Sequence, residues 1–453
     1  MSTRTIWQDQ RRAGSALAFL LCTSIAVIIL TFLFRPGLLD VAYFVLTVGI
    51  GFWLFSAGSA WFFGWMWLLF FFSPFFRRVI DYVLNTYSSP PLVLLSSLTV
   101  AFISSITLFR YGKRLAEPMF RPHLMALVVI GYGYLLALAT RGLVTATEEL
   151  LKWLVPILLS FHLLIFWRLY PTYREVTRTA FTVGVALMGL YGIYQYFYLP
   201  GWGINTMINS EMASIGAPRA REARVFSTLN SPGPFGMIMM VGLLFLFDRQ
   251  SWISLLVAVP GYAGWALASV RASWVGWVFG MGLLLYGLRG KQRVRLAALA
   301  GAVMLICTPF FGYLAITERF VNRATTLVDV QQDGSFQGRA GQYSDIATVL
   351  INNPIGNGLG SIYYDSGIVT AFHQLGFLGL VYLAALGLML WRAWRSAQDQ
   401  DDTFVTFAWA VGTTMGFLLL AGSQQIGVAG CAMWGFVSLA IAGRMYNDEE
   451  GLG

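Results

Sequence analysis

The sequence predicts an all-α polytopic membrane protein with about fourteen transmembrane helices. Hydrophobic residues make up 57% of the chain and charged residues only 11%, whereas an ordinary soluble domain has about 25% charged residues. The mean hydropathy is +0.66, and apolar runs long enough to cross a bilayer recur along the whole chain. These runs predict helices, because a membrane-spanning barrel would show alternating polar and apolar residues.

Seven apolar runs precede the first long polar segment. The first run follows Arg4, Arg11 and Arg12 and lacks a small-residue cleavage site, so we expect an anchor and not a cleaved signal. The second and third runs meet at a Ser-Ala-Gly-Ser stretch, and merging them would reverse the sidedness of everything that follows. The seven predicted spans are 15–34, 38–56, 60–76, 92–110, 122–140, 151–169 and 177–199.

Two longer loops, which we expect to carry short amphipathic helices, divide the rest of the chain. The second group of predicted spans is 232–248, 252–269, 273–288, 293–314, 367–391, 403–421 and 426–443. The predicted organisation is therefore 1–199 for spans one to seven, 200–231 for a first loop, 232–314 for spans eight to eleven, 315–366 for a large loop, and 367–453 for the last three spans and the tail.

Basic residues near helix ends support this count, because they mark the cytoplasmic side. With fourteen spans, both termini are cytoplasmic, and the short basic segments on that side are Arg110–Arg114, Arg168–Arg178, Leu288–Arg295 and Trp391–Arg395. The net charge of +9 is then mainly an orientation signal, and no soluble domain is left to bind a nucleic acid.

The cysteines and histidines predict neither disulfides nor metal binding. Cys22, Cys307 and Cys431 all lie in apolar runs, and no Cys/His spacing resembles a metal site.

Arginines on the predicted outer side are the feature that topology does not explain, and lysine is nearly missing there. Arginine grips phosphate oxygens bidentately, which a lysine cannot do, so a phosphorylated ligand would account for the choice. The alternative is pairing with local acids or lipid headgroups, which we favour for Arg219, Arg221, Arg319 and Arg323. The remaining outer arginines are Arg141, Arg224, Arg271 and Arg339.

Three of these arginines stand in distinctive settings. Arg224 lies just before a predicted helix start, where Asn230 or Ser231 can cap the helix and Pro232 suits its first turn. The free N–H groups at that helix end would attract an anion. Arg271 stands in a very short hairpin with no acid nearby in sequence, so it needs a partner in space.

Arg339 lies in the large loop, just ahead of an amphipathic stretch. Tyr343, Ile346, Ala347 and Leu350 recur there at helical spacing, which predicts a helix on the membrane surface. The segment Asn352–Gly360 (Asn-Asn-Pro-Ile-Gly-Asn-Gly-Leu-Gly) is then a run of turns, whose glycines either reverse the chain or let a ligand approach.

The order of these motifs resembles the O-antigen ligase and polymerase superfamily (WaaL and Wzy types). Arg224 with Asn-Ser-Pro, Ser-Val-Arg271, Arg339, Asn-Pro-Ile-Gly-Asn-Gly-Leu-Gly and Leu375-Gly-Phe-Leu-Gly379 carry the resemblance, over roughly residues 180–400. It implies a periplasmic-facing inverting glycosyltransferase of the bacterial inner membrane that uses an undecaprenyl-pyrophosphate-linked oligosaccharide donor and a glycan acceptor, without cofactor or metal. A chain-length regulator and a flippase are candidate partners.

One departure from the family pattern favours a polymerase over a ligase. Ligases of the family have a His followed by Asn, Ser or Gln. Nine residues then separate this pair from a Gly, which is followed after two more residues by another small residue or Tyr. Aligning Gly376 and Gly379 with these last two positions puts Asp365-Ser366 at the position of the pair. His373 is eight positions out of register, and we interpret it as a packed or pore-lining helix residue. A carboxylate can deprotonate a sugar hydroxyl, although Asp365 could instead cap a helix or pair with an arginine.

The resemblance therefore implies that Arg224, Arg271 and Arg339 bind the donor pyrophosphate while Asp365 activates the acceptor, with Asn230, Ser231, Tyr343 and Arg141 contributing to substrate binding. A ligase that transfers glycan to lipid A core is the first alternative. The second is a lipid-linked oligosaccharide transporter, against which the two long outer loops and unlike halves speak. A structural scaffold for polysaccharide export would not need arginines in outer hairpins.

Overall fold

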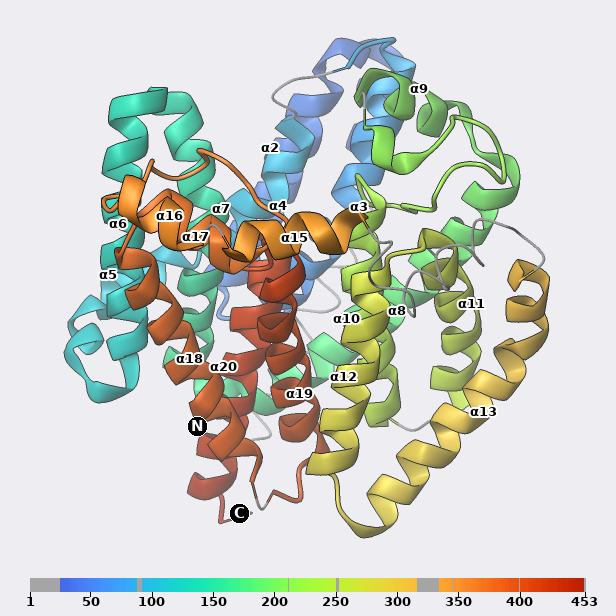
Figure 1. The fold of residues 1–453 in the computed structure, drawn as a ribbon. Coiled ribbons are helices and arrows are strands. Elements are labelled where there is room, and N and C mark those ends of the chain that lie inside the picture. Colours follow the sequence, from blue (N-terminus) through green and yellow to red (C-terminus); the bar gives the residue numbers. More distant parts are fainter. Residues whose placement is uncertain are drawn as a thin grey trace. The chain divides into compact units, whose positions relative to one another are not determined.

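The computed structural model describes residues 25–87, 92–210, 212–249, 252–315, 334–344, 346–398 and 400–451, and this part of the chain is almost entirely helical (Figure 1). Its sole extended pairing is an isolated bridge between Gly216 and Ala223. The predicted helical class is therefore confirmed. Several positions singled out above lie outside the described residues, namely Arg4, Arg11, Arg12, Cys22, Arg319 and Arg323.

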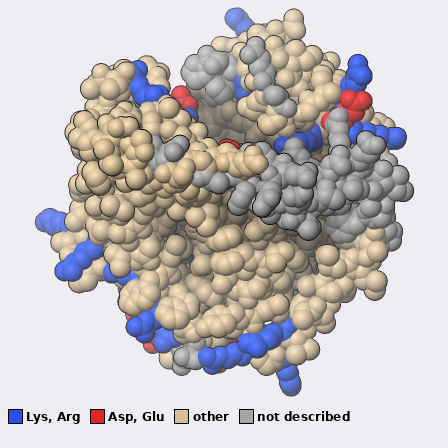
Figure 2. Space-filling view, in the orientation of Figure 1, with Lys and Arg blue, Asp and Glu red and all other residues tan. Residues whose placement is uncertain are grey.

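Several of the helices are long and apolar enough to cross a bilayer, which fits a multi-pass membrane protein. Among the described residues six segments meet this length and composition, and three shorter apolar helices accompany them. Uncharged residues also cover most of the face in Figure 2, where Lys and Arg stand mainly near its edges. The six segments are Pro36–Ser56, Leu92–Ala116, Pro118–Arg141, Trp167–Tyr198, Thr403–Ala421 and Gly427–Glu449.

The chain forms two compact units that are interleaved in sequence. The first contains the described residues of Met1–Ile103 and Pro171–Val270, and the second those of Ser104–Tyr170 and Arg271–Gly453. The first half of the chain therefore contributes helices to both units.

Unit 1 is a helical bundle with a folded outer loop. A glycine contact holds two of its helices close, since a Cβ on Gly189 would lie 2.6 Å from the carbonyl oxygen of Pro260, and Trp67 packs on Phe181 with ring centroids 5.0 Å apart. The helices are α2 (Leu39–Ser56), α3 (Trp61–Val83), α4 (Leu92–Phe102), α8 (Tyr170–Tyr198), α9 (Gly201–Ser210), α10 (Pro232–Arg249) and α11 (Trp252–Ala268).

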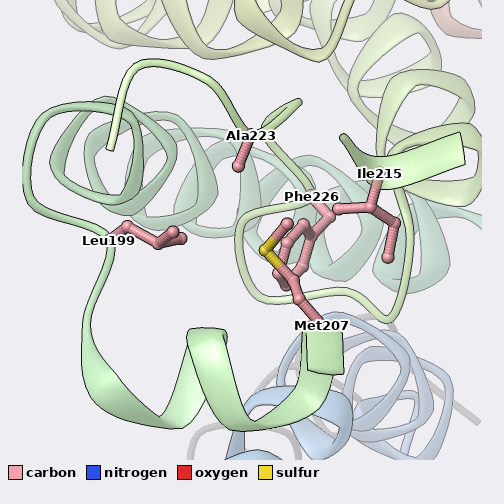
Figure 3. Packing of buried hydrophobic residues seen from close by; sticks show 5 residues of the cluster. All are labelled: Leu199, Met207, Ile215, Ala223 and Phe226. Atoms are coloured by element: carbon pink, nitrogen blue, oxygen red, sulfur yellow. The ribbon is translucent and has the colours of Figure 1, made fainter. Parts of the chain in front are cut away.

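The predicted loop 200–231 has a small hydrophobic core of its own. Figure 3 shows Met207 of α9 beside Phe226, with Leu199, Ile215 and Ala223 completing the cluster. All five side chains are buried. This segment is thus an ordered part of unit 1, which positions the residues that follow it.

The last helix of unit 2, α20 (Gly427–Glu449), packs on α19 (Thr403–Phe417) and on α7 (Leu143–Ile165). A buried chain of hydrogen bonds joins His123, Ser160 and Ser438 across three helices of this unit. The helices are α5 (Ser105–Tyr111), α6 (Arg121–Arg141), α7 (Leu143–Ile165), α12 (Arg271–Gly287), α13 (Gly290–Ala315), α15 (Gly334–Ser344), α16 (Ile346–Asn352), α17 (Gly367–Leu375), α18 (Leu378–Ala397), α19 (Thr403–Phe417), the short η7 (Leu418–Ala421) and α20 (Gly427–Glu449).

Hydrogen bonds define two ends of unit 2. At one end, Arg392 donates to the carbonyl oxygens of Pro118 and Met119, and Arg444 donates to that of Gln398. At the opposite end, which we call the loop end, Arg141 donates to Ser361 O at 2.9 Å. Within unit 2, the segment Trp391–Arg395 therefore lies near the start of α6, and Ser361 lies near its other end.

The glycine run 356–360 packs against protein backbone. Gly358 has φ +79°, and a Cβ there would lie 2.6 Å from the backbone nitrogen of Ala137 in α6. Gly356 has φ +83°, and a Cβ there would lie 2.6 Å from Gln374 O. Only glycine adopts these angles readily. The predicted roles were chain reversal and ligand approach, and the close backbone of α6 and α17 explains both glycines without a ligand.

Replacing Gly358 with alanine should destabilise unit 2 by about 3 kcal/mol, since it combines a strained backbone angle with overpacking. Thermal unfolding of the purified protein in detergent measures the effect. Gly387→Ala in α18, where a Cβ meets nothing within 4 Å, is the matched control and should leave the midpoint nearly unchanged. Equal midpoints for the two variants would contradict the packing described here.

Candidate functional site

The predicted site residues fall into both units, so each unit is described separately. Arg224, Asn230 and Ser231 belong to unit 1, and Arg141, Arg271, Arg339, Tyr343 and Asp365 belong to unit 2.

The guanidinium of Arg224 is directed at main-chain carbonyls of unit 1. Its Nε donates to Ala268 O at 3.1 Å, Nη1 to Ser214 O at 3.0 Å and Nη2 to Ser269 O at 3.0 Å. These bonds tie the loop 212–231 to the end of α11. The Arg224 side chain therefore stabilises the loop, and a bound anion would compete with three carbonyl oxygens for its N–H groups.

The start of α10 is where the proline pattern predicts it. Pro232 is the first helical residue, and Phe235 N donates to Ser231 O at 3.3 Å. Pro232 and Pro234 have no N–H, so among the first three residues only Gly233 could offer one to an anion. Asn230 Oδ1 is buried and lacks a hydrogen-bond partner among the described residues. The helix end is therefore a poorer anion site than its position suggests.

Asp365 is exposed between two anchored neighbours at the loop end of unit 2. On one side, Tyr364 N donates to Thr370 Oγ1 at 3.0 Å, and Ser423 Oγ donates to Tyr364 O at 3.3 Å. On the other side, Ser366 is buried and caps α17, with its Oγ accepting from Val369 N. Asp365 itself makes no hydrogen bond or ion pair within the described ranges, so a carboxylate at a fixed position faces solvent.

Tyr343 of α15 contacts Ser366, the residue that follows Asp365. Its hydroxyl lies 2.8 Å from Ser366 Oγ and donates to Leu420 O at 3.0 Å. The stretch predicted to be helical falls on α15 and α16, on either side of residue 345, and α15 is anchored next to Asp365 through Tyr343. Arg339 lies one turn before Tyr343 in the same helix.

Arg271 is the first residue of α12 and is partly buried. Gly287 of α12 packs on Thr406 of α19, and Phe279 stacks on Phe417 with ring centroids 4.3 Å apart. Because η7 continues α19 directly after Phe417, Arg271 lies at the η7 end of α12. Tyr343 and Ser366 donate hydrogen bonds to the carbonyl oxygens of Leu420 and Leu419 in η7, so they lie near the same end.

Sequence reasoning missed a carboxylate in the same region. Tyr363 donates a hydrogen bond to Glu149 Oε2, and Lys152 pairs with Glu149 at 2.8 Å and with Glu148 at 2.9 Å. Burial, and then the Glu149 carboxylate, raises the pKa of Tyr363, which keeps its hydroxyl protonated as a donor. Glu149 and Tyr363 are far apart in sequence, so no local signal could have joined them.

Gln374 holds the same segment from the other side. Its Oε1 accepts from Gly360 N at 3.0 Å and its Nε2 donates to Ile362 O at 3.1 Å. The residues 360–363 are thus held by α7 and α17 immediately before Asp365.

His373 is packed, which is one of the two settings predicted for it. It is 8% exposed, one ring nitrogen lies 3.2 Å from Ser361 Oγ, and the other lies 3.3 Å from Asn357 Nδ2. Both nitrogens are therefore occupied within the glycine loop.

Arg77 and Arg78 are further arginines that the sequence reasoning overlooked. They follow the third predicted span, so the predicted topology already put them on the outer side. Arg77 pairs with Asp81 at 3.0 Å, whereas Arg78 reaches the loop that contains Arg224.

Arg219 and Arg221 lie in the same loop as Arg224. Arg221 lies over the ring of Phe197 at 5.5 Å, and Arg219 is exposed. Within the described residues, no three His, Cys, Asp or Glu side chains form a group that could hold a metal ion. Comparisons with protein-family models and with curated proteins found no match to this chain.

Replacing Arg224 with lysine should loosen the loop 212–231, because one ammonium cannot replace three guanidinium bonds to carbonyls. Limited trypsin digestion in detergent should then cut faster after Arg219 and Arg221. Arg219→Lys is the control, since both changes preserve the number of trypsin sites. Unchanged cleavage in Arg224→Lys would show that the three bonds do not hold the loop.

Tyr363→Phe should destabilise unit 2 by about 2 kcal/mol, the usual value for a hydrogen bond to a charged group. Tyr364→Phe is the control, because the Tyr364 hydroxyl makes no hydrogen bond within the described part of the chain. Thermal unfolding compares the two, and an equal effect would contradict the Glu149 contact.

Proposed function

We propose that the chain is a lipid-pyrophosphate-dependent glycosyltransferase of the bacterial inner membrane. In this proposal, about fourteen spans place both termini in the cytoplasm and the loop end of unit 2 in the periplasm. The enzyme polymerises oligosaccharide repeat units carried on undecaprenyl pyrophosphate, as Wzy-type members of the O-antigen ligase and polymerase superfamily do. The observation that carries the proposal is the exposed Asp365 carboxylate, held between anchored residues beside the helix of Arg339.

Asp365 is the proposed general base. Its carboxylate takes the proton of an acceptor hydroxyl on one repeat unit, and the oxygen attacks the anomeric carbon of the donor sugar from the face opposite the pyrophosphate. The new glycosidic bond forms as the bond from carbon to the pyrophosphate oxygen breaks, with inversion at that carbon. Anchoring of Tyr364 and Ser366 supports this role, because a fixed base loses little freedom during the reaction.

Arginines stabilise the departing undecaprenyl pyrophosphate in this mechanism. Arg271 and Arg339 are the proposed pyrophosphate ligands of unit 2, and Arg141 and Tyr343 border the sugar. An ion pair at about 4 Å is worth roughly 4 kcal/mol at an effective dielectric of about 20, and less where water enters. Arg224 contributes mainly by organising the loop that presents Asn230 and Ser231, since its bonds to three carbonyls favour that use.

The packing of His373 favours polymerisation over transfer to lipid A core. A ligase of the resembling type would need a histidine at the position of Asp365, and both ring nitrogens of His373 are engaged by Ser361 and Asn357. The acceptor is therefore proposed to be the non-reducing end of another lipid-linked repeat unit.

Purified protein incubated with undecaprenyl-pyrophosphate-linked repeat unit from the host strain should produce a ladder of longer lipid-linked glycans, read by gel or mass spectrometry. Asp365→Asn should lower the rate at least about 100-fold, because a general base of this kind contributes roughly 100- to 10,000-fold. Asp401→Asn, an exposed carboxylate in the turn before α19, should keep full activity.

The outcomes separate the alternatives. Transfer only to an added lipid A core acceptor would make the protein a ligase. Absence of transfer to either acceptor would contradict the glycosyltransferase proposal, and movement of the lipid-linked unit across reconstituted vesicles would then identify a transporter.

A further inference from the structure

Arg78 is a fully buried cation in unit 1. It lies in α3 and is 0% exposed. Its Nε donates to Pro74 O at 3.3 Å and its Nη2 to Ser227 O, whereas Nη1 has no hydrogen-bond partner among the described residues. No carboxylate pairs with it in the described part of the chain. Burying an unpaired charge is costly, so its retention calls for a reason.

The residue that Arg78 contacts is held in a strained conformation. Ser227 has φ +50° and occupies the second position of a turn in which Leu229 N donates to Phe226 O at 3.0 Å. A positive φ at that position favours glycine. A serine there costs on the order of 1–3 kcal/mol and persists only where the surroundings hold it.

Three side-chain contacts hold Ser227 in place. Gln195 Oε1 accepts from Ser227 N at 2.7 Å, Ser227 Oγ donates to Met188 O at 2.6 Å, and Arg78 donates to Ser227 O. The Arg78 guanidinium also lies 4.8 Å from the centre of the Phe226 ring. The turn is therefore fixed between α3 and α8.

We infer that Arg78 is a positioning residue, which holds the strained Ser227 turn and thereby sets the place of Asn230, Ser231 and the start of α10. The chain between the turn and α10 is only a few residues long, so the helix start follows the turn. The link to substrate rests on the proposed function. The link between Arg78 and the turn does not.

The strain itself supplies a specific test. Glycine adopts φ +50° at no cost, so Ser227→Gly should remove the need for Arg78 to oppose strain, although it also removes the bond to Met188. If Arg78 acts through this turn, Ser227→Gly should partly rescue an Arg78 variant. A residue that only adds stability to the bundle would gain no such rescue.

The turn can be read by cysteine labelling. In a chain with Cys22, Cys307 and Cys431 changed to serine, Leu229→Cys puts a thiol at a side chain that is 3% exposed, and a membrane-impermeant maleimide reports opening of the turn. Arg78→Met should raise the labelling rate about tenfold, and adding Ser227→Gly should lower it again. Arg77→Met is the control at the neighbouring position. It breaks the buried ion pair with Asp81 and so destabilises α3 generally, but it should raise the rate less than Arg78→Met, and Ser227→Gly should not reverse its effect.

Two results would overturn the inference: equal labelling in Arg78→Met and Arg77→Met, or no reversal by Ser227→Gly. In the glycan ladder assay, Arg78→Met should raise KM for the lipid-linked donor while kcat stays within a few-fold, and rescue should restore KM. A fall in kcat alone, with KM unchanged, would indicate a merely stabilising role. If the unaltered protein shows no transfer, the proposed function fails while the labelling result stands.

Discussion

The structure depends on one constraint: irregular backbone that is buried away from water must find its hydrogen-bond partners within the protein. The glycine loop meets this constraint closely. Asn357 N and Gly358 N donate to the carbonyls of His373 and Gln374, and Leu359 N donates to Gly133 O of α6. Each of these bonds needs the chain to approach a helix backbone without a side chain between them. The positive-φ glycines and the anchored carboxylate downstream are consequences of that pairing.

Arginine serves several purposes in this chain, which explains why counting outer arginines overstates the number of ligand contacts. Arg224 and Arg78 both donate to the carbonyls of serines in the left-handed region, Ser269 and Ser227 respectively. A guanidinium suits this role because it is planar and has several N–H donors, which can bond to carbonyl oxygens that accept no hydrogen bond within a helix. Arginine at a loop is therefore informative about function only after its carbonyl contacts have been counted.

The sequence predicted what local rules govern. Hydropathy indicated the helical class, the proline rule placed the start of α10 at Pro232, and helical spacing predicted the helix around Tyr343. It could not join Glu149 to Tyr363 or Arg78 to Ser227, because these contacts link residues far apart in the chain. It also treated 367–391 as one helix, whereas Gly376, with φ +58°, separates α17 from α18. Breaks of this kind arise from tertiary contacts, here with Pro354.

The interleaving of the two units has a consequence for biogenesis. Unit 1 needs residues from both Met1–Ile103 and Pro171–Val270, and the intervening segment belongs to the other unit. During synthesis α3 can therefore pack on α2 and α4 at once, but its contacts with Phe181 of α8 and with Ser227 form only after the intervening segment has been made. Until then Arg78 lacks its bond to the Ser227 carbonyl, and a fragment that ends before Pro171 would lack the second part of unit 1.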